Sequence, residues 1–245
     1  MEPAVLREDM VDSLEHESKG CVRSERVSVA MRAVPRHAFV GDERGAYADR
    51  PFERLGTRVL SPSTVGRLLE ALDAEDGDSV LVVGAGVGYT AAVLAEIAGA
   101  ENVHAIDIAR RLVIDARQNL AEAGYEGVLV DRRDGADGLP EYAPYDRILL
   151  EAAAISPPRA LVDQLAEGGR LVMPHGAGEQ AIAVVEDGEV RERLGGVAFQ
   201  PMLLEGEQPD TVERNRTRRE DREFARRNAR GRAGWEQGWI DWDGD

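Results

Sequence analysis

A glycine-rich turn between a short apolar strand and an apolar helix constrains this chain more than any other feature. Residues 79–83 form an apolar, β-branched run, residues 84–88 read Gly-Ala-Gly-Val-Gly, and residues 89–98 are apolar enough for a buried helix. Glycine adopts backbone conformations closed to other residues and lets a ligand approach the main chain closely. This order is typical of the ligand-binding half of a parallel α/β sheet, although such a turn can also serve only to pack a helix on a strand.

The rest of the chain up to about residue 205 alternates short apolar strands with helices. Strands are predicted at 79–83, 103–106, 128–130, 146–150, 170–173, 181–185 and 197–199, and helices at 1–33, 65–72, 89–98, 110–123 and 158–166. Residues 34–64 show little periodicity, and Ser63 or Thr64 can cap the helix at 65–72. Alternation of this kind predicts an α/β fold with a central, mostly parallel sheet and helices on both faces.

An acidic residue at the end of the second strand indicates which kind of ligand the turn holds. Asp107 lies 19 residues after Gly88, where a carboxylate can accept hydrogen bonds from both ribose hydroxyls of an adenosine. A dinucleotide turn has the spacing G-x-G-x-x-G and needs glycine at 89, but Tyr89 stands there. The observed G-x-G-x-G spacing favours S-adenosylmethionine over NAD.

Two further acidic residues follow later strands. Asp134 precedes Gly135 after the third strand and can accept from an adenine amino group, or it can be an ordinary turn aspartate. Glu151 follows the fourth strand and lines the cleft floor in this interpretation, or it is a solvated loop acid. The predicted cofactor-binding residues are therefore Gly84, Ala85, Gly86, Gly88, Tyr89, Asp107, Ile108, Asp134, Gly135 and Glu151.

Composition limits the class of protein. The 245 residues carry 46 acidic and 30 basic side chains, a formal net charge of −16, with a single lysine, Lys19. This balance predicts a cytoplasmic protein adapted to high salt, because molar salt screens self-repulsion, or else an acidic protein of a GC-rich genome. No apolar run is long enough for a membrane span, and neither the four histidines nor the single cysteine has metal-ligand spacing, so we expect no membrane and no metal site.

Three segments are predicted: a helical and substrate-binding segment (1–78), a Rossmann-like cofactor domain (79–205) and a C-terminal extension (206–245). The extension has nine arginines between 214 and 232, followed by three tryptophans, Trp235, Trp239 and Trp242. It can dock on its own domain, bind a partner or contact RNA. Nucleic-acid binding is not expected for so acidic a chain, since high salt weakens the attraction. A partner for the extension stays unassigned.

Seven segments, taken together in this order, resemble the protein-L-isoaspartate O-methyltransferase family. They are 31–40 (MRAVPRHAFV), 46–52 (AYADRPF), 80–89 (VLVVGAGVGY), 133–135 (RDG), 144–148 (PYDRI), 165–174 (LAEGGRLVMP) and 196–203 (GVAFQPML). The cofactor turn alone is generic, whereas the VPR, AYxDxP and GGxLVxP segments are specific. The resemblance implies a Rossmann-like class I methyltransferase fold and methyl transfer from S-adenosylmethionine to L-isoaspartyl, and D-aspartyl, carboxylates of damaged proteins for repair.

The chain departs from the family at the segment that the resemblance implies for the reacting centre. Aligned on Pro62, Leu60 stands where the family has serine, and Ser61 follows one residue later. Ser61 with Thr57 nearby are our predicted catalytic residues, and Arg58 can also orient a carboxylate. The alternatives are a methyltransferase of the same fold with another substrate, and a non-catalytic relative that binds the cofactor.

Overall fold

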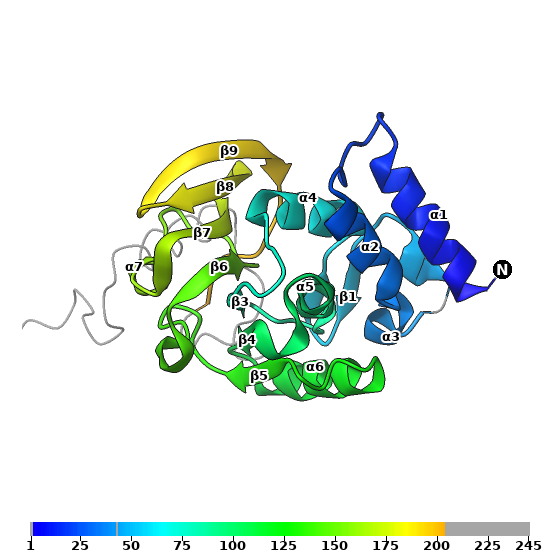
Figure 1. Cartoon of the computed structure of the whole chain (residues 1–245), viewed down its shortest axis with the longest axis horizontal. Helices are drawn as coiled ribbons and strands as arrows, with labels where there is room; N and C mark the ends of the chain where they lie inside the picture. Colours follow the sequence, from blue (N-terminus) through cyan, green and yellow to red (C-terminus); the bar gives the residue numbers. More distant parts are fainter. Residues whose placement is uncertain (1, 43, 204–245) are drawn as a thin grey trace, which may run out of the picture.

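The computed structural model describes residues 2–42 and 44–203 (Figure 1), and its centre is a seven-stranded sheet. The strands lie in the order β5-β4-β3-β6-β7-β8-β9, and neighbours from β5 to β7 run parallel while β8 and β9 are antiparallel. The bounds are β3 (Val80–Val83), β4 (Val103–Asp107), β5 (Leu129–Arg132), β6 (Tyr145–Leu150), β7 (Leu165–His175), β8 (Gln180–Glu186) and β9 (Glu189–Val197). The predicted mostly parallel sheet is confirmed.

Helices cover both faces of the sheet because its strands are apolar on both faces. In β3, Val80 and Val82 contribute to one buried cluster, whereas Leu81 and Val83 contribute to the other. The larger cluster is covered by α1 (Pro3–Glu15), α2 (Glu25–Ala33), α4 (Pro62–Leu72), α5 (Tyr89–Ala98) and α6 (Arg110–Glu122). The smaller cluster includes Leu161 of α7 (Arg159–Val162) and lies beside η3 (Pro140–Tyr142).

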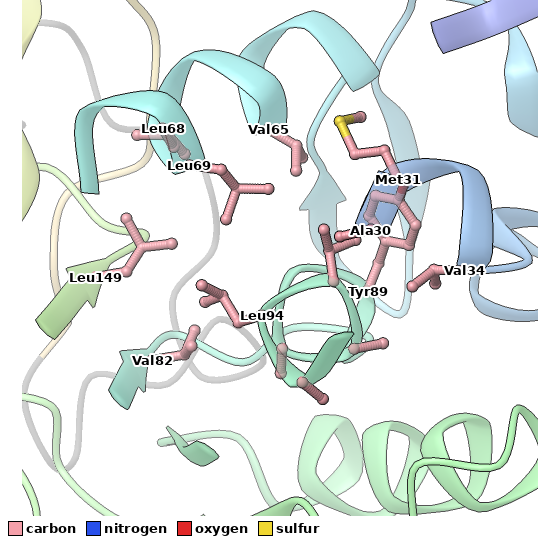
Figure 2. Close-up of a cluster of buried hydrophobic side chains, with 14 of the residues drawn as sticks. Ala30, Met31, Val34, Val65, Leu68, Leu69, Val82, Tyr89, Leu94 and Leu149 are labelled. Carbon is pink, nitrogen blue, oxygen red and sulfur yellow. The ribbon is translucent and has the colours of Figure 1, made fainter. Parts of the chain in front are cut away.

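The N-terminal helices share the larger cluster with the sheet. Figure 2 shows Met31 of α2, Leu69 of α4, Leu94 of α5 and Val82 of β3 in one apolar contact region. The helix predicted over 1–33 is wrong in one respect, because α1 and α2 are separate and residues 17–24 turn between them. Gly20 has φ +53° in that turn, and the hydroxyl of Ser24 accepts from the amide of Val27 to begin α2. The break lets both helices pack on the same core.

The segment without periodicity contains short elements. They are α3 (Arg36–Val40), η1 (Gly45–Tyr47) and a hairpin of β1 (Phe52–Arg54) with β2 (Thr57–Val59). Helix α4 then begins at Pro62, and its cap is Ser61 rather than the predicted Ser63 or Thr64. The hydroxyl of Ser61 accepts from the amide of Thr64 at 3.3 Å.

Two predictions near the C-terminal end of the sheet are wrong. The helix over 158–166 is only α7, because Leu165 already pairs with Tyr145 as the start of β7. The last strand is 189–197 rather than 197–199, because Asp187 and Gly188, both at positive φ, form a tight turn that folds β9 back on β8.

Two further predictions are not tested by the structure. Residues 206–245, with the arginine run and the tryptophans, lie outside the described residues, and the three-segment division stays a prediction. In residues 2–42 and 44–203, no helix combines the length and apolar content that a bilayer crossing requires.

Candidate functional site

A cavity that is open to solvent lies at the carboxyl ends of the parallel strands, and its empty space, with open solvent included, is about 1040 Å³. Its floor is formed where β3 has β4 on one side and β6 on the other, which is the switch point at which open α/β sheets bind ligands. Four segments complete the lining: the β1–β2 hairpin region (55–58 and 60), the β3–α5 turn (83, 84 and 86), the β4–α6 junction (106–109, 111 and 112) and residues 198–203, with Gly135 and 150–152.

A smaller cavity of about 260 Å³ has lining residues in common with the first. Thr57, Arg58, Leu60, Gly86 and Glu151 line both. The smaller cavity is also lined by Ala85 of the glycine turn and by Tyr89 and Thr90 from the start of α5. The site therefore has two ends: one beside β4 and one between the hairpin and α5.

Asp107 anchors the β4 end. Its side chain is 8 % exposed; Oδ2 accepts from the amide of Gly86 at 3.0 Å, and Oδ1 accepts from the amide of Ala109 at 2.9 Å. Burial raises the pKa of this carboxyl, and those amide hydrogen bonds oppose the rise. The carboxylate fixes the glycine turn while lining the cavity, so it can accept hydroxyl donors from a ligand with its remaining lone pairs.

The glycine turn divides into residues that face the cavity and residues that pack. Gly86 has φ +53°, and a Cβ there would meet only the carbonyl oxygen of Gly84, at 3.9 Å, so its main chain is accessible to a ligand. Gly88 lines neither cavity; at φ +91° a Cβ would lie 3.2 Å from Leu120, which shows close packing of α5 on α6. Because Gly88 lines neither cavity, its predicted role in cofactor binding stays a prediction.

Tyr89 lies mainly in the core (Figure 2). Its side chain is 2 % exposed, its ring meets Phe39 edge-on at 5.7 Å, and the guanidinium of Arg36 lies 4.5 Å from the ring centre. It reaches the smaller cavity only, as Ala85 does, so a cofactor role for either residue stays a prediction.

The third strand contributes less to the cavity than predicted. Gly135 lines it, packed so closely that a Cβ would lie 2.6 Å from Val83, and Ile108 lines it from the β4–α6 junction. Asp134 is outside the lining, and its Oδ1 accepts from the amide of Ala136 at 2.8 Å, as in an ordinary aspartate turn.

Glu151 lies at the end of β6, at the junction of the two cavities. Its amide donates to the carbonyl of Val83 at 2.8 Å, whereas its Oε1 is shielded from solvent and has no hydrogen-bond partner. Burial raises the pKa of this carboxyl to about 7; a hydrogen bond from Thr90 lowers it, the charge of Asp107 raises it, and the charge of Arg36 lowers it. Glu151 as a whole is only half-buried, and its shielded, unpartnered Oε1 is what distinguishes it from a solvated loop acid.

The hairpin places one of the two predicted hydroxyls at the cavity. Thr57 and Arg58 of β2 line both cavities, and so does Leu60, which is 8 % exposed. Ser61 lines neither cavity. Its hydroxyl caps α4 and lies 2.9 Å from the hydroxyl of Thr64 and 3.1 Å from that of Ser63.

Arg36 supports the segment around Leu60 from within the core, a role that sequence reasoning missed. It is fully buried; Nε donates to the carbonyl of Ala46 at 2.9 Å, and Nη2 donates to the carbonyl of Leu60. Burial lowers its pKa, and both carbonyls help to satisfy the charge. A buried arginine that binds main-chain carbonyls fixes the path of the chain where it passes the cavity.

Sequence reasoning also missed the wall formed by residues 198–203 and the ion pair that holds the hairpin. Residues 198–203 approach the β6 end, where the amide of Met202 donates to the carbonyl of Ala153 at 3.0 Å. The hairpin is held over the cavity by Arg54, which donates to both oxygens of Asp115 at 2.9 and 2.7 Å. Arginine and aspartate 61 residues apart give no local pattern, so no sequence signal identifies this pair. The described residues bring no three histidine, cysteine or acidic side chains together as a metal site.

Comparison with known proteins gives one consistent result. The sequence model of the family described as Protein-L-isoaspartate(D-aspartate) O-methyltransferase matches residues 6–204. A protein-L-isoaspartate O-methyltransferase of Aeropyrum pernix is 46 % identical over 206 residues, which cover 80 % of this chain and 78 % of that protein.

Solved structures show the same fold. One titled protein-L-isoaspartate O-methyltransferase has a TM-score of 0.69 at 25 % identity, over 79 % of this chain and 64 % of that one. A putative protein-L-isoaspartate O-methyltransferase of Plasmodium falciparum, in complex with S-adenosyl-L-homocysteine, has a TM-score of 0.70 at 22 % identity, over 80 % of this chain and 98 % of that one.

Proposed function

The chain belongs to the protein-L-isoaspartate(D-aspartate) O-methyltransferase family, and from this premise we propose how its own residues carry out the family's reaction. The reaction is methyl transfer from S-adenosylmethionine to the free carboxylate of L-isoaspartyl residues, and of D-aspartyl residues, in damaged proteins. The observation that carries the proposal is one cavity at the switch point of the sheet, lined by Asp107, by Gly86 and by the hairpin.

The residues of the β4 end fit an adenosyl group. Asp107 is a buried acceptor for ribose hydroxyls, and the accessible main chain at Gly86 lets a ligand lie against the turn. Gly84, Ile108 and Gly135 line the same space. When bound there, the cofactor supplies an electrophilic methyl group on a sulfonium sulfur.

The acceptor carboxylate needs positioning more than activation. A main-chain-type α-carboxyl has a pKa of about 3.5, so it is ionised at neutral pH and is already a nucleophile. No general base is required, and catalysis rests on holding the carboxylate oxygen in line with the methyl carbon. The oxygen forms the new bond to carbon, the carbon–sulfur bond breaks, and its electron pair stays on sulfur.

We assign the positioning to the hairpin. Thr57 and Arg58 of β2 line both cavities, and their side chains carry a hydroxyl and a guanidinium, groups that donate hydrogen bonds to carboxylates. Leu60 adds an apolar surface, which removes water from the reacting groups and strengthens these charge-assisted bonds. Ser61 does not enter this proposal because its hydroxyl caps α4.

The setting proposed for this activity is a salt-rich cytoplasm. A net charge of −16 and one lysine among 30 basic residues support it. Dense carboxylates repel one another at low salt, and molar salt shortens the range of that repulsion to about 3 Å.

The experiment uses the full chain in high salt with methyl-labelled S-adenosylmethionine and two peptides that differ only in an isoaspartyl or an aspartyl linkage. We expect base-labile label on the isoaspartyl peptide alone. Label on neither peptide, despite measured binding of S-adenosylmethionine, refutes the substrate and favours a methyltransferase with another acceptor or a binding relative. Failure to bind the cofactor refutes the proposal as a whole.

A further inference from the structure

We propose that Glu151 is the counter-ion for the cationic methionyl end of the cofactor and releases a proton when the cofactor binds. This inference rests on the proposed function, since it takes S-adenosylmethionine as the ligand. It adds a charge-pairing site at the junction of the two cavities, on the other side of β3 from Asp107.

The position of Glu151 supports the assignment. Asp107 is the last residue of β4 and Glu151 follows β6, and these strands lie on opposite sides of β3. Between them lies the glycine turn, and a Cβ on Gly84 would lie 3.5 Å from the Cβ of Glu151. A ligand whose ribose is held at Asp107 therefore reaches Glu151 by crossing the turn, and its reactive end then lies beside Thr57 and Leu60.

The carboxyl of Glu151 has an incomplete set of partners. Oε1 is buried without a hydrogen-bond partner, although the larger cavity opens beside it. A buried carboxylate is costly unless it is paired, so such a group either keeps a proton or meets a cation. The sulfonium and ammonium groups of S-adenosylmethionine are the cations that this ligand offers.

The neighbouring charged groups do not neutralise Glu151. Arg36 of α3 donates through Nε and Nη2 to the carbonyls of Ala46 and Leu60 and lies over the ring of Tyr89, and its buried Nη1 makes no hydrogen bond to Glu151. From α5, Tyr89 stays uncharged because burial raises its pKa. Asp107 of β4 adds like charge.

On the hairpin side, Arg58 of β2 is nearly half exposed and lies 3.9 Å from Glu53. A cationic ligand is then the missing partner, and it converts a carboxyl with a pKa of about 7 into a paired carboxylate.

The sign of the effect follows from linkage. Free Glu151 is about half protonated at pH 7, and pairing with a cation lowers its pKa, so binding releases about half a proton there. The release approaches one proton per site at pH 6 and falls to about 0.1 by pH 8. Affinity weakens about tenfold from pH 8 to pH 6, because the ionised fraction falls to about a tenth.

The test is titration calorimetry in buffers of different ionisation enthalpy with three ligands. S-adenosylmethionine carries both cations, S-adenosylhomocysteine only the ammonium, and 5′-methylthioadenosine neither. We expect proton release with S-adenosylmethionine and none with 5′-methylthioadenosine. Release with S-adenosylhomocysteine assigns the pairing to the ammonium, and its absence there assigns it to the sulfonium.

Variants complete the test. Glu151→Gln should abolish the proton release and leave 5′-methylthioadenosine affinity unchanged. It should also remove the part of the pH dependence of S-adenosylmethionine affinity that the titration of the ligand itself does not explain. Glu126→Gln, at an exposed position between α6 and β5, should behave like the unaltered chain. Binding of S-adenosylmethionine without proton release, or release that persists in Glu151→Gln, overturns the inference and leaves the methyltransferase proposal intact. Binding of none of the three ligands removes both.

Discussion

A polar side chain at this site can order the main chain, bind a ligand or do both, and its hydrogen bonds show which. Asp107 holds two amides of neighbouring turns and faces the cavity, whereas Ser61 holds an amide and faces away from it. An acceptor that orders the main chain can thus also bind a ligand only if it retains an accessible lone pair. Three substitutions test this distinction.

Asp107→Asn removes the charge at constant size and directs one amide N–H toward a main-chain donor. We expect cofactor affinity to fall by about 10- to 100-fold, since hydrogen bonds to a charged acceptor contribute about 1.5–3 kcal/mol. Calorimetry with S-adenosylhomocysteine measures the loss. Asp163→Asn, at an exposed position beside α7, is the matched control. An unchanged dissociation constant for Asp107→Asn contradicts the ribose assignment.

Thr57→Val and Ser61→Ala separate chemistry from capping. Thr57→Val should lower kcat/KM for an isoaspartyl peptide by roughly tenfold with little change in stability, because it removes only a donor in the cavity. Ser61→Ala should cost about 1 kcal/mol of unfolding free energy and leave kcat/KM within about twofold, because it removes an N-cap. Peptide kinetics and denaturant unfolding of both variants decide, and the reverse pattern restores Ser61 as the catalytic hydroxyl.

At the scale of elements, the site depends on how a small hairpin is attached to a large sheet. Strands β1 and β2 pair only with each other, so the hairpin has no ladder to the central sheet among the described residues. Its attachments include two hydrogen bonds from Arg54 to Asp115 and one from Arg111 to the carbonyl of Leu55. Asp115 and Arg111 are both side chains of α6. Helix α6 therefore supports the hairpin, to which we assign substrate positioning, as well as the β4 end of the site.

Arg54→Met keeps the aliphatic length and removes the bidentate bond. Both partners are largely buried, and Asp115 raises the pKa of Arg54, which marks a genuine pairing. We expect faster amide exchange in residues 55–59, a higher KM for peptide and a loss of about 1 kcal/mol. Exchange followed by mass spectrometry measures the first effect. Arg191→Met, which breaks an exposed pair on β9, should leave this region unchanged. Identical exchange in both variants means that the hairpin is held by other contacts.

On the scale of the whole molecule, stability should depend on pH through the buried acids of the site. Glu151 has a pKa raised to about 7 from its usual value, and the pKa of Asp107 is also raised. A raised carboxyl pKa contributes stability that is fully present below the unfolded value and is lost as pH rises through the folded value. The site therefore opposes folding at neutral pH until a cation is bound.

We expect the ligand-free protein to lose about 2–3 kcal/mol from this source between pH 5 and pH 7.5. Glu151→Gln should show a flatter profile over this window, and S-adenosylmethionine should restore stability to the unaltered chain. Denaturant unfolding at constant, high ionic strength measures both profiles. Parallel profiles of variant and unaltered chain would mean that Glu151 is not protonated in the folded state.

Net charge makes a second prediction at this scale. With a formal charge of −16, added KCl between 0.1 and 2 M should raise Tm by at least about 5 °C, because it screens repulsion among carboxylates. Surface ion pairs such as Arg117–Asp131 weaken in the same salt, but each contributes little. A Tm that falls or stays constant contradicts salt adaptation.

Patterns that are local in sequence were enough to predict the sheet, the glycine turn and the position of Asp107. Short apolar runs, strand–turn–helix order and the distance from Gly88 to Asp107 all act over about twenty residues, where spacing alone decides geometry. Boundaries were wrong where a strand start competes with helix propensity, as at Leu165, and where a tight turn folds one strand back on another, as at Asp187-Gly188.

Tertiary structure alone decided which predicted residues share the cavity. It turned Tyr89 into the core against Arg36, gave the hydroxyl of Ser61 to α4 and left Thr57 facing the cavity. It also brought residues 198–203 beside Glu151 and buried one oxygen of that carboxyl, Oε1, without a hydrogen-bond partner. These outcomes depend on packing between segments tens to more than a hundred residues apart, and side-chain direction at such contacts follows from the closed core rather than from any local spacing.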